Sequence, residues 1–249
     1  MGSNRRLRVA TSLLLGACAA TGVRAQATAD PCVRCDVMYA VDCGVGLWAI
    51  DLRTGTSALI ASMSDSFYDL AVTSDGRLVG VNAEGVLRSI SACDGTIAPL
   101  AGPSVGNGLT GYLDNTDVLA QGPPLVRVDS AGLGTSAIVG GAVGLGPPAW
   151  CGSSLGDLAI SPVDGLLRTA LGCACPSGAT ALQVVDPATG DVVRDAGCLL
   201  DGAGNSYPGV FGLAYDSTAL WGVEGSFVPR LLRVDPDPAL GVPLPIGGG

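Results

Sequence analysis

The sequence consists of short apolar runs separated by tight-turn residues, and this pattern restricts the chain to a fold of short strands. The stretch 68–101 shows the pattern most completely. Its four apolar runs lie at 69–73, 77–81, 86–91 and 96–100. The turns between them are Asp75-Gly76, Glu84-Gly85 and Asp94-Gly95, which are typical of connections between antiparallel strands. The stretch is therefore predicted to be a four-stranded antiparallel meander.

Similar units occur before and after this stretch. Their predicted strands are 37–42, 47–52 and 57–62 in the first unit; 108–110, 117–121, 125–129 and 135–139 in the third; 157–160, 166–171, 181–186 and 191–196 in the fourth; and 212–215, 219–223, 231–235 and 242–246 in the fifth. The residues that end the third strand of each unit are Asp51, Ser91, Asp129, Asp186 and Asp235, which are 40, 38, 57 and 49 positions apart. These spacings are typical of the blades of a β-propeller.

A β-sandwich is the alternative fold for many short strands, and the apolar pattern within each strand separates the two. Sandwich strands alternate apolar and polar residues because one face is wet. Here 78–81 and 219–223 are apolar on both faces, as expected for strands pressed between neighbouring blades. With no Lys and only two Glu, the chain also lacks the residues that solvate long helices. We predict an all-β chain whose residues 37–249 form a β-propeller of about five four-stranded blades.

The first blade is predicted to be incomplete, because its first unit has no innermost strand. Residues 26–36 supply that strand, or the ring is imperfectly closed, or the natural chain once continued further. The sequence leaves these three alternatives open.

The repeated residues resemble those of a known group of proteins. Asp-Leu-Ala recurs at 69–71 and 157–159, and the units share a turn, a strand that ends in Ile/Val-Asp in four of the five units, and Thr-Gly at 54–55 and 189–190. Across residues 37–247 this pattern resembles the blade repeats of secreted bacterial β-propellers of the NHL, YVTN and quinoprotein-like kinds. The resemblance implies the fold and carries no particular activity.

The first 25 residues differ from the rest and predict a secretory signal peptide. A basic start at 4–8 precedes an apolar run at 9–20, and small residues lie before Gln26. That run is too short for a permanent transmembrane span. Residues 26–36 then form a cysteine-containing lead-in. We expect a secreted or periplasmic protein; the alternative is a lipid anchor at Cys18, because 15–18 resembles a bacterial lipoprotein box.

The charge balance bears on the kind of partner. The chain has 13 Arg against 22 acidic residues, a net charge of −9, and loss of residues 1–25 changes this to −13. Such a chain is repelled by nucleic acid and by anionic lipid surfaces. We expect a small molecule, a glycan or a protein as partner, and Ca²⁺ as the possible metal.

Eight cysteines remain beyond the leader, and in an exported protein we expect them to form disulfides. They are Cys32, Cys35, Cys43, Cys93, Cys151, Cys173, Cys175 and Cys198. The last four fall in connections on one face of the predicted ring and are expected to pair among themselves, whereas Cys93 is expected to pair with Cys32 or Cys35. Zinc at Cys32-x-x-Cys35 is the less favoured reading because the chain has no His.

Missing residue types restrict the chemistry. Without His or Lys there is no imidazole base, no Schiff base and no phosphate-binding P-loop. We therefore predict no catalytic residue. The blade geometry places one set of candidate ligand-binding residues on the top face, where the innermost strands begin: Tyr68, Asp69, Glu84, Trp150, Asp157 and Glu224. For Asp69 and Asp157 the structural interpretation, in which the carboxylate accepts backbone N–H groups, is favoured.

Two functions follow from these residues. The first is an exported, non-catalytic propeller that binds a ligand or partner or acts as an envelope scaffold. The alternative is a Ca²⁺-dependent hydrolase or lyase acting on a sugar or a lactone through Asp69, Asp157 and Glu224.

Overall fold

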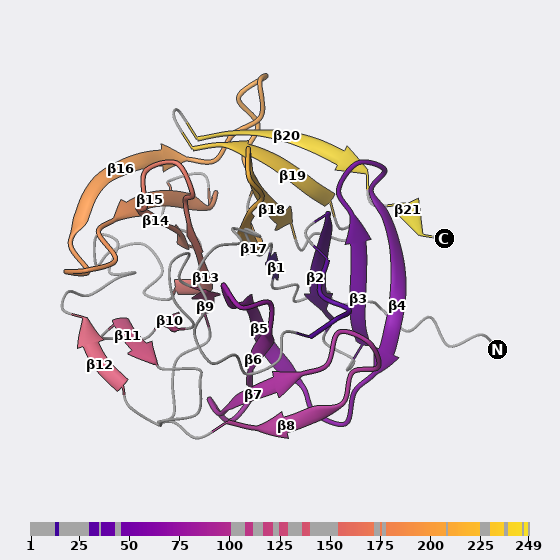
Figure 1. The fold of residues 1–249 in the computed structure, drawn as a ribbon. Coiled ribbons are helices and arrows are strands. Elements are labelled where there is room, and N and C mark those ends of the chain that lie inside the picture. The colour runs from indigo at the N-terminus through magenta and orange to yellow at the C-terminus, as the bar shows by residue number, and fades with distance from the viewer. Residues whose placement is uncertain are drawn as a thin grey trace.

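The computed structural model describes residues 13–14, 30–34, 36–42, 46–100, 108–111, 117–121, 125–128, 136–139, 154–171, 175, 178–207, 209–224, 230–236, 239–245 and 247–248. All regular elements in this part of the chain are β-strands. They form five sheets that are arranged radially around a common centre (Figure 1). This arrangement confirms the predicted β-propeller.

Each sheet is one blade, and its strands follow one another from the centre to the rim. Blade 1 contains β1 (Leu13–Leu14), β2 (Val37–Val41), β3 (Gly46–Asp51), β4 (Thr56–Ser62) and β21 (Gly247–Gly248). Blade 2 contains β5 (Phe67–Val72), β6 (Leu78–Asn82), β7 (Leu87–Ile90) and β8 (Ile97–Pro99). Blade 3 contains β9 (Gly108–Gly111), β10 (Val118–Gln121), β11 (Leu125–Val128) and β12 (Ser136–Val139).

Blade 4 contains β13 (Ser154–Ile160), β14 (Leu167–Leu171), β15 (Ala181–Val185) and β16 (Val192–Cys198). Blade 5 contains β17 (Val210–Tyr215), β18 (Leu220–Glu224), β19 (Arg230–Asp235) and β20 (Leu240–Pro245). Neighbouring strands within each blade pair antiparallel, except β21, which pairs parallel with β4. Every strand predicted from the sequence is present, with ends that differ by up to three residues. Gly76, Gly85 and Gly95 have positive φ at the predicted turns of blade 2, a conformation that glycine adopts without steric cost.

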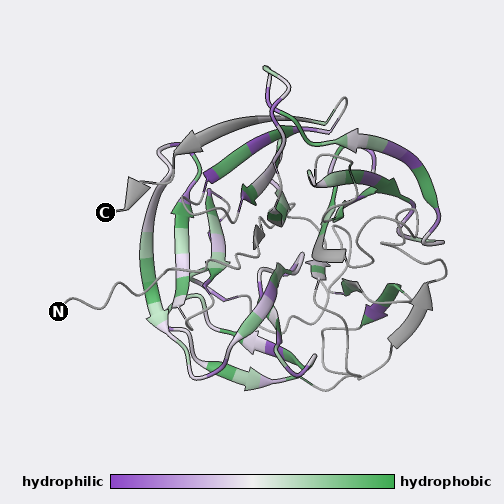
Figure 2. Ribbon diagram, turned by 180° about the vertical axis from the view of Figure 1, so that it is seen from behind, coloured by the Kyte–Doolittle hydropathy of each residue, from purple (hydrophilic) through white to green (hydrophobic). Residues whose placement is uncertain are grey.

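The blades pack face to face through their inner strands. Every residue of β6, β14 and β18, the second strands of three blades, is buried. This two-sided burial is what the apolar pattern of 78–81 and 219–223 predicted. The outer strands are more exposed and carry both polar and apolar residues, as β16 does (Figure 2). Hydrophobic burial between blades is therefore the main stabilising contribution within the described residues.

The first blade differs from the prediction at its innermost position. β1 pairs antiparallel with β2, with Leu13 opposite Ala40 and Leu14 opposite Tyr39. It also contacts β5 of blade 2 and β17 of blade 5, so the ring is closed at this point. A strand from residues 26–36 was one predicted alternative, but the described residues 30–34 lie elsewhere, beneath blade 2. The parallel pairing of β21 with β4 was not predicted.

Among the described residues, the structure has no helix of the length and apolarity that crossing a membrane requires.

Candidate functional site

The top of blade 2 presents an aromatic side chain to solvent through a β-bulge. The register between β5 and β6 changes from Phe67 opposite Asn82 to Asp69 opposite Val81, which leaves Tyr68 as the extra residue. A bulge redirects the side chain of its extra residue. Tyr68 is accordingly 48% exposed, whereas Phe67 and Asp69 on either side are 3% and 0% exposed.

The same irregularity recurs where other inner strands begin. In β17 the register changes between Val210 and Gly212, so Phe211 occupies the position equivalent to Tyr68. In β13 it changes between Ser154 and Asp157, so Asp157 is equivalent to Asp69. The side chains of Phe211 and Asp157 lie outside the described part of the structure. The repeat nevertheless places both positions at the same face of the ring as Tyr68.

The Asp69 carboxylate binds two backbone N–H groups. Its Oδ1 accepts a hydrogen bond from the Leu70 N–H at 2.7 Å, and its Oδ2 accepts one from the Leu109 N–H at 2.5 Å. Hydrogen bonding of this kind satisfies backbone groups that are otherwise buried without a partner. The interpretation of Asp69 as a carboxylate that accepts backbone N–H groups agrees with these contacts.

A polar residue at the end of the second strand stabilises the following turn in blades 1 and 2. In blade 1, Asp42 accepts hydrogen bonds from the Gly46 N–H at 2.8 Å and from Trp48 Nε1 at 2.9 Å. In blade 2 the equivalent residue is Asn82, whose Oδ1 accepts hydrogen bonds from the N–H groups of Glu84 and Val86. Asn82 was not among the candidates named from the sequence, which were acidic and aromatic residues.

Glu224 ends the second strand of blade 5 and is buried, with 2% exposure. Its carboxylate forms an ion pair with Arg230, whose Nε and Nη2 each lie 2.5 Å from Oε2. The guanidinium of Arg230 also lies over the ring of Tyr207, 5.2 Å from the centroid. Burial raises the pKa of the Tyr207 hydroxyl, and the nearby Arg230 partly opposes this. The sequence contains no sign that an arginine neutralises Glu224.

Glu84 differs from Glu224 although both lie near the end of the second strand of their blade. It lies exposed in the turn after β6, at the same end of blade 2 as Tyr68. Asp65, in the connection that leads into β5, accepts a hydrogen bond from Asn82 Nδ2 at 2.9 Å and lies 3.8 Å from Arg88 Nε. Blade 2 therefore combines an exposed aromatic ring with carboxylates at its top. Trp150, also predicted here, lies outside the described residues.

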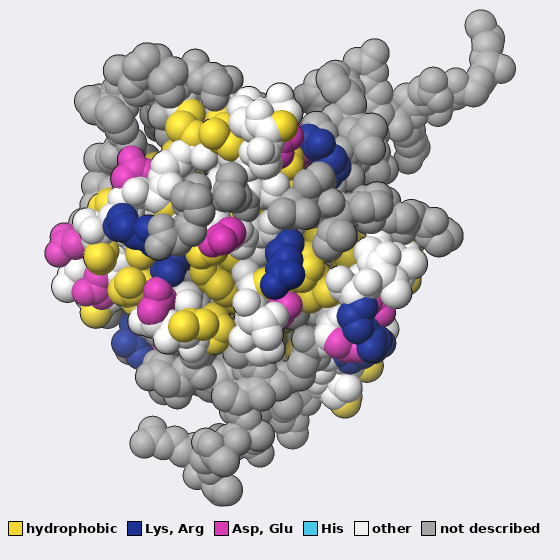
Figure 3. Space-filling model, turned by 90° about the horizontal axis from the view of Figure 1, so that it is seen from above, with side chains coloured by type: hydrophobic (Ala, Val, Ile, Leu, Met, Phe, Trp, Pro, Cys, Tyr) yellow, Lys and Arg dark blue, Asp and Glu magenta, His cyan; other side chains and the backbone are white. Residues whose placement is uncertain are grey.

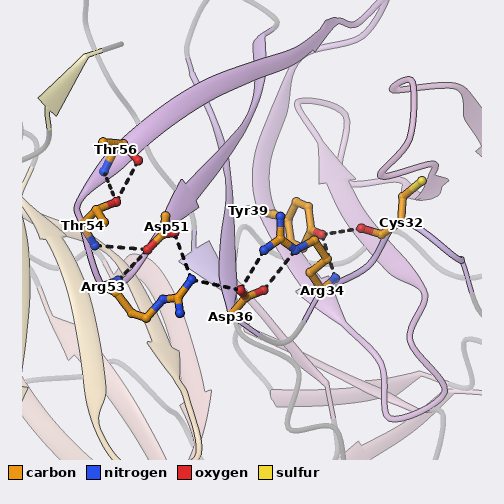
Figure 4. Close-up of polar contacts among 8 residues, drawn as sticks. All are labelled: Cys32, Arg34, Asp36, Tyr39, Asp51, Arg53, Thr54 and Thr56. Carbon is orange, nitrogen blue, oxygen red and sulfur yellow. Dashed lines mark hydrogen bonds and ion pairs between the residues drawn. The ribbon is translucent and has the colours of Figure 1, made fainter.

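A second polar cluster, which the sequence did not predict, lies under blade 1 (Figure 4). Asp36 accepts hydrogen bonds from Arg34 Nε at 3.1 Å and Nη2 at 2.7 Å, and Arg53 Nη2 lies 3.7 Å away. These hydrogen bonds from Arg34 lower the pKa of the Asp36 carboxyl. The Tyr39 hydroxyl donates to the Cys32 carbonyl at 2.8 Å and accepts from the Arg34 N–H. The cluster fastens the lead-in to β2.

The disulfides follow the predicted distribution between the two faces. Cys32 pairs with Cys93 beneath blade 2, and Cys175 pairs with Cys198 at the top of blade 4, with Cα–Cα distances of 5.1 and 5.9 Å. Both pairings are among those expected. The remaining predicted disulfide residues, Cys35, Cys43, Cys151 and Cys173, lie outside the described part of the chain.

One small group of described residues has the spacing of potential metal ligands. This group places three potential ligand atoms close enough for a shared ion: Asp30, Cys32 and Cys93. The two sulfurs of this group are joined in a disulfide, and the Asp30 carboxylate accepts hydrogen bonds from the N–H groups of Cys32 and Ala92. The oxidised group therefore holds the lead-in against blade 2.

Charged side chains of both signs lie among apolar ones on the side of the molecule seen in Figure 3. Some of the described ion pairs link residues close in sequence, as Arg77 and Asp75 do at 2.8 Å, whereas others, such as Arg88 and Asp65, join different segments. Among the described residues in this view, charges of both signs are interspersed.

Two solved structures resemble the chain at low sequence identity. A structural genomics protein of unknown function from Bacteroides thetaiotaomicron matches with a TM-score of 0.51 and 12% identity, over 75% of this chain and 53% of that chain. The Dos1 propeller matches with a TM-score of 0.42 and 12% identity, over 86% of this chain and 56% of that chain. This chain thus spans about half the length of both. No protein-family model and no curated protein matches the sequence.

Proposed function

We propose that the protein is an exported, non-catalytic β-propeller that binds a neutral glycan at the top of blade 2. The observation that carries this proposal is the bulge in β5, which exposes Tyr68 between two fully buried neighbours. Aromatic rings bind the apolar faces of sugars, and nearby carboxylates such as Glu84 accept hydrogen bonds from sugar hydroxyls. The net charge of −9 favours a neutral ligand over an anionic one.

The contacts of two other candidate acids, Asp69 and Glu224, argue against a catalytic role for them. Asp69 accepts two backbone N–H groups, and Glu224 is ion-paired with Arg230. A catalytic acid or base needs access to the substrate and a pKa suited to proton transfer. Both carboxylates are buried and already engaged in contacts within the protein.

The same contacts weaken the Ca²⁺-dependent alternative. A calcium site needs several carboxylate or carbonyl oxygens turned toward one point. Of the three carboxylates that this alternative requires, Glu224 has a guanidinium in the place where a cation would bind. Calorimetric titration with CaCl₂ tests it directly: saturable binding that is lost in Glu224→Gln would restore this alternative.

Glycan binding is tested with immobilised cellulose, chitin and galactan and with their soluble oligosaccharides. We expect retention on at least one polymer, and a Kd for its oligosaccharide that is at least tenfold weaker in Tyr68→Ala. The matched control is Leu59→Ala, because Leu59 is 50% exposed on the outer strand β4, away from the top face. Equal affinity of both variants, or retention of a protein partner instead of any polymer, would overturn the proposal.

Export is proposed on the basis of the leader and is supported by the two disulfides, which persist in oxidising compartments. Mass spectrometry of the processed protein distinguishes the two forms. A chain that begins at Gln26 indicates release, and a chain that begins at a lipidated Cys18 indicates anchoring.

A further inference from the structure

The inner edge of β2 lies in a narrow apolar slot between two blades. Val37, Tyr39 and Val41 pack with residues of blade 2, whereas Met38 and Ala40 pack with residues of blade 5. All five are at least 95% buried. A strand that pairs with this edge is therefore enclosed on both faces, so it must be apolar at consecutive positions.

The N-terminal segment meets this requirement and occupies the slot. Leu13 and Leu14 pair antiparallel with Ala40 and Tyr39, and β1 contacts β5 and β17 on either side (Figure 1). Residues 9–20 around it are mostly apolar. The run of apolar residues that predicts an export signal also meets the requirement of the slot, which encloses apolar side chains.

The lead-in cannot take this place while its own contacts hold. The Asp30 N–H donates to the Gly76 carbonyl at 3.2 Å, and the Asp30 carboxylate accepts from the Ala92 N–H at 2.6 Å. The Cys32–Cys93 disulfide adds a covalent link to the same underside of blade 2. Residues 30–34 are thus fixed outside the slot.

We infer that the inner edge of β2 is a binding site for an extended apolar strand, and that the protein's own N-terminal segment around Leu13–Leu14 is its occupant in the unprocessed chain. Pairing with a sheet edge gives affinity through main-chain hydrogen bonds, and enclosure on both faces adds hydrophobic burial. Cleavage after Ala25, which the proposed export implies, breaks the covalent link between this strand and the ring. The slot then holds the segment only by non-covalent contacts.

The test uses the full chain with a specific protease site inserted between Ala25 and Gln26 and cut after folding. We expect the released 1–25 segment to co-elute with the ring in size-exclusion chromatography, and the amides of β2 to exchange as slowly as before cleavage. In Leu13→Asp/Leu14→Asp, two charges enter the slot, so the cut segment should separate and the β2 amides should exchange at least tenfold faster. Leu13→Val/Leu14→Val is the matched control and should behave as the unaltered chain.

A synthetic peptide of residues 9–18, with Ser in place of Cys18, provides the second arm. Added to the cut and separated Leu13→Asp/Leu14→Asp protein, it should bind saturably and restore slow exchange in β2. Separation of the unaltered segment with no change in β2 exchange would overturn the inference. So would identical behaviour of the Asp and Val variants. Because glycan retention through Tyr68 is measured independently, failure of either proposal leaves the other standing.

Discussion

The buried carboxylate of Asp69, in the inner strand of blade 2, accepts a hydrogen bond from the backbone N–H of Leu109, in the inner strand of blade 3, at 2.5 Å. The same side chain accepts the N–H of Leu70 in its own strand. One residue therefore fixes both the start of β5, just after its bulge, and the position of the neighbouring blade. Asp-Leu-Ala recurs in blade 4 at 157–159, the equivalent place in the sequence repeat.

Replacing Asp69 should destabilise the ring. In Asp69→Ala, the buried N–H of Leu109 loses the acceptor described above, at a cost of about 1–3 kcal/mol. Asp69→Asn retains one acceptor oxygen and should lose less. Urea unfolding followed by tryptophan fluorescence measures both. If Asp69→Ala unfolds at the same urea concentration as the unaltered protein, the carboxylate does not hold the blades together.

Gly111 should tolerate no larger residue. A Cβ at this position would lie 2.2 Å from the Val72 carbonyl oxygen, which belongs to the backbone of β5 and cannot move alone. Overpacking of a buried site typically costs about 1–3 kcal/mol, so Gly111→Ala should lower the midpoint of unfolding clearly.

Gly202→Ala is the control for this prediction, because nothing lies within 4 Å of the Cβ that would be added there and its φ is not in the left-handed region. Its unfolding midpoint should stay close to that of the unaltered protein. Equal effects of the two substitutions would mean that the approach of β5 to β9 is not as close as described.

The strands were predictable because their signal is local. Turn pairs such as Asp75-Gly76 and apolar runs such as 78–81 act over a few residues, and the blade period repeats them. The environments of the site residues were not predictable, because they depend on partners distant in sequence or on a change in register. The exposure of Tyr68 comes from a one-residue bulge, and the pairing of β1 with β2 joins segments more than twenty residues apart.

The two described disulfides should contribute unequally. Cys32–Cys93 spans 61 residues and Cys175–Cys198 spans 23, and the loop-entropy relation gives about 4 and about 3 kcal/mol for these separations. We expect Cys32→Ser/Cys93→Ser to lose more stability than Cys175→Ser/Cys198→Ser in chemical denaturation under non-reducing conditions. The reverse order would show that Asp30 and Tyr39 hold the lead-in without the covalent link.

Asp216 should make the protein sensitive to acid. Burial by itself would raise the pKa of this carboxyl, but hydrogen bonds from Trp221 Nε1 at 2.8 Å and from the Thr218 and Ala219 N–H groups at 2.6 Å lower it overall. A carboxyl whose pKa is lower in the folded state contributes stability that is fully present above its unfolded pKa of about 3.9. That contribution is lost as the pH falls through the lower, folded value.

Trp221→Phe removes one of these donors and leaves the backbone donors in place. We expect the pKa of Asp216, followed by carboxyl NMR, to rise, and acid unfolding to begin at a higher pH. Trp48→Phe is the matched control. Trp48 donates to Asp42 in the same way at 2.9 Å, and it is not among the described hydrogen-bond donors to Asp216. An Asp216 titration that responds equally to both substitutions, or to neither, would show that the indole hydrogen bond does not set this pKa.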